Sequence, residues 1–515
     1  MLRKIICLNA ILAALLVAAV LIYPPVRALL DLRDPALRQP GTPAAAWRGF
    51  HYLTPRFAAW ARARREDGRA ATTSTNDVSG TEWPLFGTVF YLWSVENFQT
   101  AWDAGDHAAG VEPRVFARDA VIAATELVTD PRQAGWVKKH WGDDYLHREN
   151  VFYRTLLISA LTAREKLLGD KYQLEVLRDQ VESLARELDA APTGLLLDYP
   201  RHCYPGDVMR AWWSVRRADP VLGTDHSRQI TRALRSFTGI HTTRRQLPPY
   251  SASPDGKPNS DARGCANSYM LLSAPELWPV AAREWFDLYD KSYWQERLTA
   301  AGYREFAPDR AGGSDWTLDS VDAGPVVGGY GVTACAFGLG AARLNGRFDR
   351  AYPLTAELLA TMWELPTGER LIPRLLSNAA DAPLLGEAAF LWHFTLQPAK
   401  GFPVKTGGAL PLYAELATGL PLLLAAFLLL VSGYNFASAR RLKKDPEITA
   451  PGLQIGAWAF CLGGAGGTWA TGHPGWALLL FLAALAFPRL PRRKAPKGTE
   501  DWEANSAPPP AAPKV

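Results

Sequence analysis

The sequence predicts an all-α protein built as an (α/α)6 barrel or helical toroid, with one transmembrane helix before it and three after it. Three observations lead to this fold class. Apolar residues recur at three- and four-residue spacing through most of residues 30–408. Joints rich in Gly or Pro separate these stretches, and few segments alternate as strands do. Long apolar runs lie near both ends of the chain.

The first apolar run, Ile5–Tyr23, carries no charge. At about 1.5 Å per residue it reaches across the hydrocarbon core of a bilayer, which is about 30 Å thick. We expect a retained anchor, because the run is longer than the core of a usual secretory signal. A cleaved signal with a small-residue site at Val26-Arg27-Ala28 is the alternative. In both cases the domain that follows is exported.

Three further apolar runs follow the exported domain: Leu410–Val431, Leu453–Thr471 and Gly475–Phe487. The last two form a tight pair around the turn at 471–474. The predicted division of the chain is an anchor at 1–29, an exported domain at 30–408, three transmembrane helices at 409–489 and a disordered cytoplasmic tail at 490–515, which is rich in Pro and Ala.

Basic residues predict the orientation in the membrane. Arg3 and Lys4 precede the first run, a cluster at 440–444 follows the second, and another at 489–497 follows the last. The positive-inside rule then places the main domain on the outer side, that is, periplasmic on a multi-pass inner-membrane protein. The basic clusters are expected to contact anionic lipid headgroups.

The overall charge of +5 comes from the segments that are predicted to be cytoplasmic. Residues 1–4 and 440–515 hold 12 Lys and Arg against 5 Asp and Glu, whereas the rest of the chain carries a net charge of −2. The exported domain is therefore nearly neutral, which argues against nucleic acid as a partner.

Each predicted helix of the exported domain carries an apolar stripe, and several begin with Pro, Asp or Ser as helix starts do. Short strands are expected at most at Leu195–Asp198 and from Leu298 onward. The predicted helices are Trp47–Arg65, Pro84–Trp102, Pro113–Val128, Glu149–Leu168, Tyr172–Leu188, Asp207–Arg217, Ser227–Phe237, Ala266–Leu288, Gly331–Leu344, Pro353–Trp363 and Leu384–Phe394.

Three cysteines, Cys203, Cys265 and Cys335, fall in the exported domain. They show no CxxC motif and no spacing typical of zinc sites, so we expect no metal and no cofactor. An odd thiol is usually a buried small apolar group. Cys203 is the least typical of the three, because His202 and Tyr204 flank it.

The first candidate site segment runs from Trp141 to Tyr153. Its carboxylates stand at a helix N-terminus, where they cap backbone N–H groups and meet the positive end of the helix dipole. Capping alone accounts for them. The functional alternative is that Asn150 and Tyr153, three residues apart on one helix face, line a cavity and bind substrate.

The second segment, 197–210, places a carboxylate, an imidazole, a thiol, two phenols and another carboxylate close together. Such groups beside an apolar pocket suit proton transfer, because burial separates the pKa values of a donor and an acceptor. We expect Asp198 and Cys203 to be catalytic. The substrate-binding candidates here are His202, Tyr204 and Asp207.

Two further segments supply candidates. Asp319 and Asp322 precede a glycine-dense loop that leads past Tyr330 into a helix. No Lys-Ser/Thr pair follows, so a phosphate loop is rejected. Two readings remain: close packing of the backbone, or binding of a ligand hydroxyl group by the carboxylates, with Tyr330 as a further substrate-binding residue. Glu82 opens an aromatic-rich helix start, which fits either core packing or an apolar ligand pocket with Glu82 as a catalytic acid.

These segments, in this order, resemble the linalool dehydratase-isomerase family over residues 80–365. The resemblance rests on Trp141-Gly-Asp followed by Glu149-Asn150-x-x-Tyr153, on 198–217 with Gly223-Thr224-Asp225, and on the Asp319/Asp322 loop running into 341–346. It implies an (α/α)6 barrel, an exported location, and cofactor-free acid–base chemistry on a small isoprenoid alcohol.

The chain departs from the family at several positions. The family's two site thiols fall on Leu197 and near Gly206, and its site histidine falls on Leu156. The carboxylate after the first thiol is kept as Asp198. Cys203 then stands in for a thiol in a shifted register, and Glu82 stands near the family's catalytic acid.

The expected function is that of a membrane-anchored lyase or isomerase. It would dehydrate, hydrate or isomerise a small apolar or lipid-like alcohol with two proton-exchanging groups and no metal. A cell-envelope glycan-modifying enzyme, with Asp319 and Asp322 as paired carboxylates, is the first alternative. A non-catalytic envelope protein that binds lipid or a partner is the second, and assembly into a homo-oligomer is left open.

Overall fold

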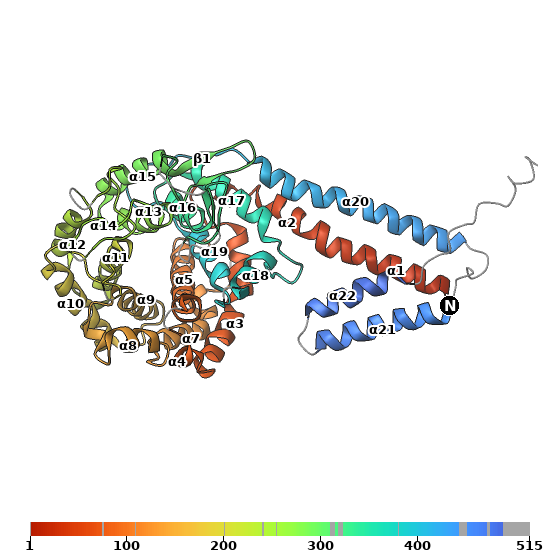
Figure 1. Cartoon of the computed structure of the whole chain (residues 1–515), viewed down its shortest axis with the longest axis horizontal. Helices are drawn as coiled ribbons and strands as arrows, with labels where there is room; N and C mark the ends of the chain where they lie inside the picture. The colour runs from red at the N-terminus through yellow and green to blue at the C-terminus, as the bar shows by residue number, and fades with distance from the viewer. Residues whose placement is uncertain are drawn as a thin grey trace, which may run out of the picture. The chain divides into compact units, whose positions relative to one another are not determined.

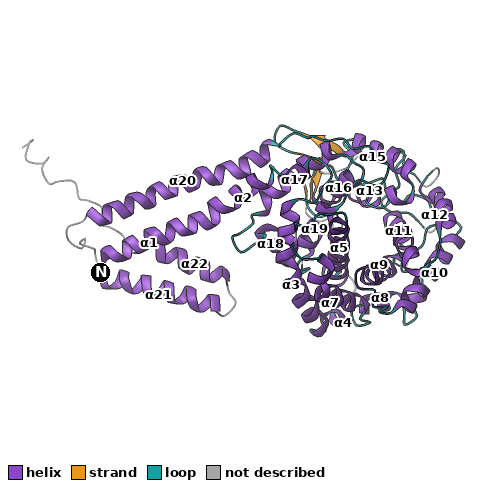
Figure 2. Ribbon diagram, turned by 180° about the vertical axis from the view of Figure 1, so that it is seen from behind, coloured by secondary structure: helices purple, strands orange, loops and turns teal. Residues whose placement is uncertain are grey.

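The computed structural model describes a mostly helical protein of two compact units (Figures 1 and 2). The central unit comprises Tyr23–Leu420, and the terminal unit comprises Met1–Ile22 and Pro421–Val515. The described residues are 2–74, 77–108, 110–199, 201–238, 242–253, 255–309, 315–317, 323–379, 381–441, 451–470 and 474–487.

Six helices of the central unit contact one another in a closed order (Figure 1). Each contacts the next, and the last contacts the first. Their apolar side chains belong to one hydrophobic core that extends through the unit. In chain order they are α5 (Val78–Asp103), α9 (Val151–Leu168), α11 (Pro205–Leu222), α13 (Gly264–Leu271), α16 (Val332–Leu344) and α19 (Leu385–Thr395).

A second set of helices packs against this inner cycle. Amphipathic patterns explain their position, since α10 buries Leu177, Val181, Leu184 and Leu188 and exposes its charged face. α3 contacts α7 and α19, α7 and α10 contact α9, α15 contacts α13, α17 contacts α16, and α18 contacts α19. Their bounds are α3 (Ala44–Glu66), α7 (Arg118–Thr129), α10 (Leu174–Ala190), α15 (Pro279–Tyr293), α17 (Phe348–Met362) and α18 (Leu371–Ala379).

Short elements complete the central unit. β1 (Trp294–Glu296) and β2 (Ala301–Tyr303) form an antiparallel hairpin in which Trp294 lies opposite Tyr303. β3 (Trp316–Thr317), β4 (Val326–Val327) and β5 (Tyr330–Gly331) form an antiparallel sheet in that order. The short helices are α2 (Tyr23–Asp31), α4 (Arg69–Thr72), α6 (Pro113–Phe116), α8 (Gly135–Trp141), α12 (Ser227–Ala233) and α14 (Ala274–Leu277), with 3-10 turns at Pro35–Leu37, Tyr145–His147 and Leu234–Phe237.

The expectation of a mostly helical chain is confirmed, with local corrections. The stretch 113–128 is two helices that meet at Ala117, and 266–288 is three, because Pro275 and Pro279 each begin a new helix. Leu195–Asp198 forms no strand; this stretch is an irregular lead into a turn at 199–202.

The terminal unit consists of α1 (Leu2–Val17), a π-helical turn (Ala18–Ile22), most of α20 (Leu412–Arg441), α21 (Pro451–Ala470) and α22 (Pro474–Leu485). Among the described residues, two continuous helices, Arg3–Asp31 and Leu412–Arg440, are long and apolar enough to cross a membrane. Asn9 of α1 ties the unit together. Its Nδ2 donates to the carbonyls of Ala484 and Phe487, and its Oδ1 accepts from Trp458 Nε1 at 2.9 Å.

Candidate active site

Three carboxyl groups from separate parts of the sequence gather at one end of the inner helices. Glu82 lies in the first turns of α5, Asp207 lies in the first turn of α11, and Asp198 lies in the loop before α11. Glu82 and Asp198 are buried, and Asp207 is half-buried. We call Glu82, Asp198 and Asp207 the acidic group.

A tight turn places Asp198 in this group. The Asp198 amide donates to His202 O at 3.0 Å, and the His202 amide donates to Tyr199 O at 2.9 Å, so the chain reverses between these residues. Asp198 Oδ2 then accepts from the Tyr204 amide at 2.8 Å, just before Pro205 begins α11. Its other oxygen, Oδ1, is buried and has no hydrogen-bond partner among the described residues.

Burial raises the pKa of Asp198 well above its usual value, and the neighbouring charges of Asp207 and Glu82 raise this pKa further. The amides of Tyr204 and Phe152 act in the opposite direction but do not outweigh burial. Like charges held close together in a low-dielectric site cannot all ionise at once. The surroundings of Asp198 therefore favour its protonated form.

Tyr199 connects to the acidic group through Glu82. Its hydroxyl group donates a hydrogen bond to Glu82 Oε1. Burial raises the pKa of the Tyr199 phenol, and the charge of Glu82 raises it further. Tyr199 thus stays protonated and holds the Glu82 carboxylate in place as an acceptor. It was not among the predicted site residues, although it follows Asp198 directly.

Cys203 lies beside the acidic group and is buried. Its carbonyl accepts from the Ala252 amide at 2.9 Å, which fixes the backbone there. Burial raises the pKa of the Cys203 thiol, and Asp198 and Asp207 raise it further. Nucleophilic cysteines need the opposite environment, one that stabilises the thiolate. Cys203 is thus a neutral thiol in this site.

Aromatic rings from four helices pack next to the acidic group. Phe86 lies one turn after Glu82 on α5, and its ring centroid is 5.6 Å from Phe152, 5.9 Å from Tyr269 and 6.5 Å from Phe337. Phe86, Phe152 and Phe337 remain half-buried although their helices face one another. Each of these three residues therefore keeps part of its surface uncovered.

Arg210 and His393 lie beneath these rings and were not predicted. The Arg210 guanidinium is fully buried and stands 4.6 Å from the Tyr269 centroid and 4.6 Å from the Trp213 centroid. Burial lowers the pKa of Arg210. Burial, together with the charge of Arg210, lowers the pKa of His393 to about 3. His393 is therefore neutral, and Arg210 is held mainly by cation–π contacts.

A second polar group adjoins the first and was also missed. Glu305 is fully buried and accepts from Arg263 Nε at 2.6 Å and from the Cys265 thiol at 3.1 Å. Burial raises the pKa of Glu305, whereas Arg263 lowers it. Arg263 also lies 4.3 Å from the ring centroid of Tyr250, and that ring is 5.4 Å from Tyr204. Cys265 and Glu305 are 40 positions apart in the sequence, so no linear motif indicated the pair.

Asn150 and Tyr153 belong to the packing around the start of α9. Asn150 occupies the N-cap position of this helix without a capping hydrogen bond from its side chain, is fully buried, and donates to Tyr145 O at 3.3 Å. The Tyr153 hydroxyl group donates to Val128 O at 3.2 Å, toward α7. Neither side chain contacts a member of the acidic group through any hydrogen bond in the described part of the chain.

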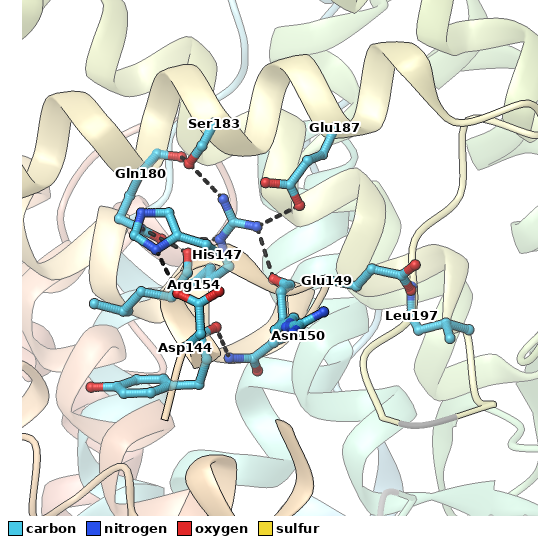
Figure 3. Close-up of polar contacts among 12 residues, drawn as sticks. Asp144, His147, Glu149, Asn150, Arg154, Gln180, Ser183, Glu187 and Leu197 are labelled. Carbon is cyan, nitrogen blue, oxygen red and sulfur yellow. Dashed lines mark hydrogen bonds and ion pairs between the residues drawn. The ribbon is translucent and has the colours of Figure 1, made fainter. Parts of the chain in front are cut away.

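Figure 3 shows what the polar residues around the start of α9 do. Arg154 is fully buried and donates to Gln180, Ser183 and Glu187 at 2.7 to 3.0 Å, which joins α9 to α10. Glu149 Oε2 accepts from the Leu197 amide at 2.9 Å. This bond holds the loop that carries Asp198. The segment 141–153 therefore supports the loop of the candidate site.

The remaining predicted residues lie elsewhere. The His202 side chain is exposed, on the outside of the turn. The Tyr330 hydroxyl group donates to Ala300 O at 2.7 Å, at the β1–β2 hairpin. Asp319 and Asp322 lie outside the described residues.

A pocket of about 540 Å³ opens at the far end of α9, where Glu165–Gly169 line it together with Arg114, Val115 and Arg118. It lies apart from the acidic group, which surrounds the opposite end of that helix. Within the described ranges, no three His, Cys, Asp or Glu side chains are placed to share a metal ion. All five cysteines are described, and none forms a disulfide bond.

Comparison with protein-family models and with curated protein sequences finds no match to this chain.

Proposed function

We propose that the central unit is an (α/α)6 barrel on the outer face of a membrane. The closed order of α5, α9, α11, α13, α16 and α19, with further helices packed outside, supports the barrel. The basic clusters at 440–444 and 489–497 support the orientation, with three C-terminal spans and a periplasmic central unit in an inner membrane. The contacts of Asn9 with α21 and α22 support spans for those two helices.

We infer that this barrel is a cofactor-free lyase or isomerase acting on a small apolar alcohol, as its resemblance to the linalool dehydratase-isomerase family implies. The acidic group beside half-buried aromatic residues carries this proposal. When the environments of two buried carboxyl groups separate their pKa values, one group can act as the acid and the other as the base. The rings offer an apolar surface to an isoprenoid chain.

Dehydration needs two proton transfers. Neutral Asp198 donates its proton to the substrate hydroxyl group, which leaves as water when the C–O bond breaks. Glu82 or Asp207 then takes the proton from the neighbouring carbon, and the C–H electron pair becomes the new double bond. The faces of Phe86 and Phe337 stabilise positive charge on the substrate carbon as the C–O bond breaks. Hydration is the same sequence in reverse.

The roles of the other candidates follow from their positions. Tyr199 holds Glu82, and Tyr204 forms part of the wall next to Asp198. Cys203 fills the space behind Asp198 as a neutral thiol. The pair of Glu305 and Cys265 supplies a second acid–base pair at the edge of the same site, reached through Tyr250 and Tyr204.

The experiment is an Asp198→Asn variant of the full chain, purified in lipid nanodiscs and assayed on linalool and related tertiary alcohols. We expect a loss of turnover of about 100-fold or more, because the amide cannot donate an acidic proton. Asp219→Asn is the matched control, since Asp219 is also buried and lies on α11 but pairs with His226 at its other end. Equal turnover in the native chain and Asp198→Asn would refute the assignment.

A further inference from the structure

Large apolar side chains are exposed on four neighbouring segments of the central unit. They lie on α2, at the turn between β1 and β2, on α18 and on the first turns of α20. The most exposed are Leu298 at 87% and Leu376 at 64%. The full set on these segments is Val26, Leu29, Leu30, Leu298, Leu375, Leu376, Tyr413, Leu416 and Leu420.

Contacts with α17 join these segments. The Tyr413 amide at the start of α20 donates to Thr299 O at 2.7 Å, beside Leu298 in the hairpin turn. The Tyr413 hydroxyl group lies 3.2 Å from Thr361 Oγ1 on α17. α17 also contacts α2 and α18. The exposed residues therefore belong to one side of the central unit, which we call the apolar rim.

The polar and apolar residues of α18 face the opposite way from those of a helix on a water-exposed surface. Its polar residues face the protein: Arg374 Nε donates to Glu387 Oε1 at 2.5 Å, and buried Ser377 Oγ accepts from the Gly386 amide at 2.9 Å. Leu375 and Leu376 between them point outward. Contiguous exposed apolar residues of this kind mark an interaction surface.

The lengths of two continuous helices indicate that lipid covers the apolar rim. In Arg3–Asp31 and Leu412–Arg440, the parts outside the central unit are residues 3–22 and 421–440, and 20 residues match the bilayer core of about 30 Å. The parts inside the central unit, 23–31 and 412–420, then begin at the edge of that core. Tyr413 lies about 10 Å along α20 from the edge, at the outer side of the headgroup layer, which is about 5 to 8 Å thick on each face of the bilayer.

We propose that the apolar rim is inserted into the interfacial layer of the bilayer, with Leu298, Leu375 and Leu376 in contact with lipid. The occupant is lipid, because the helices that emerge beside these residues continue directly into the hydrocarbon core. Tyr23 and Tyr413 stand near the two crossing points, where aromatic side chains are favoured. This inference rests on the membrane location proposed above, and it adds that the central unit itself contacts lipid.

The experiment places the photo-reactive residue p-benzoylphenylalanine at single positions in the full chain, in nanodiscs of phosphatidylethanolamine and phosphatidylglycerol. Leu298 and Leu376 are the test positions. Leu424 on α20 is the reference within the apolar span, and Val280 on α15 is the matched control, exposed by 65%. After irradiation, mass spectrometry measures the covalent lipid adduct at each position. Each variant is first shown to unfold at the same temperature as the native protein.

We expect lipid adducts at Leu298 and Leu376 at about five times the level at Val280 or more, because a side chain inserted by 5–10 Å meets acyl chains. Adducts at Leu424 but only the Val280 level at Leu298 and Leu376 would overturn the rim and leave the membrane location standing. Covalent dimers in place of lipid adducts would also overturn it. Absence of adducts at Leu424 would overturn the membrane location itself.

Discussion

At the scale of single residues, the central unit keeps several carboxyl groups in surroundings that favour the neutral form. Asp198 and Glu305 serve the candidate site, and Glu357 on α17 is a third case away from it. Burial raises the pKa of Glu357 to about 7, and its carboxylate accepts a hydrogen bond from the Ala301 amide at 2.7 Å. Folding therefore favours the protonated acid.

Glu357→Gln tests this environment through the pH dependence of stability. The folded pKa of about 7 exceeds the value of about 4.3 expected in the unfolded chain. The stabilising effect of the neutral group is thus full below pH 4.3 and is lost as the pH rises through 7. Between pH 5 and pH 8 the native chain should lose about 2 to 3 kcal/mol more than the Gln variant.

Thermal unfolding in detergent at several pH values measures this difference. Gln keeps an oxygen that accepts from Ala301, so the hydrogen bond is matched in the two proteins. Parallel curves of unfolding temperature against pH would show that Glu357 titrates normally.

At this scale, the sequence could predict which site residues lie together only where they are close to one another along the chain. Asp198, Cys203 and Asp207 lie within ten residues, so their proximity follows from the chain itself. Glu82 joins them from far away, and only its aromatic context suggested a pocket. Tyr199, Arg210 and Glu305 were missed because their roles come from burial and from distant partners.

At the scale of secondary-structure elements, the start of α9 shows how a local strain positions the site. Asn150 adopts a left-handed conformation with φ of 32°, which turns the chain into the helix. Residues other than Gly pay about 1–2 kcal/mol for such a conformation, and Asn tolerates it better than most. Glu149, the residue before Asn150, accepts a hydrogen bond from the Leu197 amide and so holds the Asp198 loop.

Paired variants at Asn150 separate backbone strain from side-chain bonding. Asn150→Ala should destabilise the chain by about 1 kcal/mol more than Asn150→Gly, because only Gly adopts positive φ freely. Both variants lose the bond to Tyr145 O, so Gly is the control for that loss. Unfolding temperatures measure the difference, and equal losses would show that the side-chain bond matters more than the backbone.

Helix positions were largely predictable because a 3.6-residue apolar period is strong over many turns. The structure extends the helix predicted at Asp207–Arg217 to Pro205–Leu222, since Pro205 suits the first helical position and Gly223 ends it in the left-handed region. α8 and α18 were missed, the first because it spans only two turns and the second because its leucines face outward.

At the scale of the whole molecule, the membrane topology is the feature that most needs a test. Lys171→Cys in the central unit and Lys443→Cys after α20 should label differently with a membrane-impermeant maleimide on intact cells. We expect labelling of Lys171→Cys at once and of Lys443→Cys only after permeabilisation, since the basic cluster stays inside. The native chain is the control for labelling of its own five cysteines, of which Cys203 and Cys265 are buried and Cys7, Cys335 and Cys461 are half-buried. The reverse pattern would invert the proposed orientation.

The sequence indicated the inventory of helices at this scale but not their partners. An apolar stripe shows which face of a helix is buried and is silent on what buries it. The closing contact between α5 and α19 depends on pairs such as Phe90 with Trp392, whose rings stack 5.0 Å apart although 302 positions separate them along the chain. No periodicity reports such a pair.

That closing contact has a consequence for how the protein is made. α5, the first helix of the closed order, leaves the ribosome long before α19. Phe90 and Trp93 on α5 therefore lack their contacts with Trp392 until α19 has been made. Contacts between such distant segments form slowly and leave apolar surface exposed meanwhile. Glu82 lies on that same helix, and its surroundings are complete only when the ring has closed. Chains that end before residue 385 are therefore expected to be targets for proteolysis.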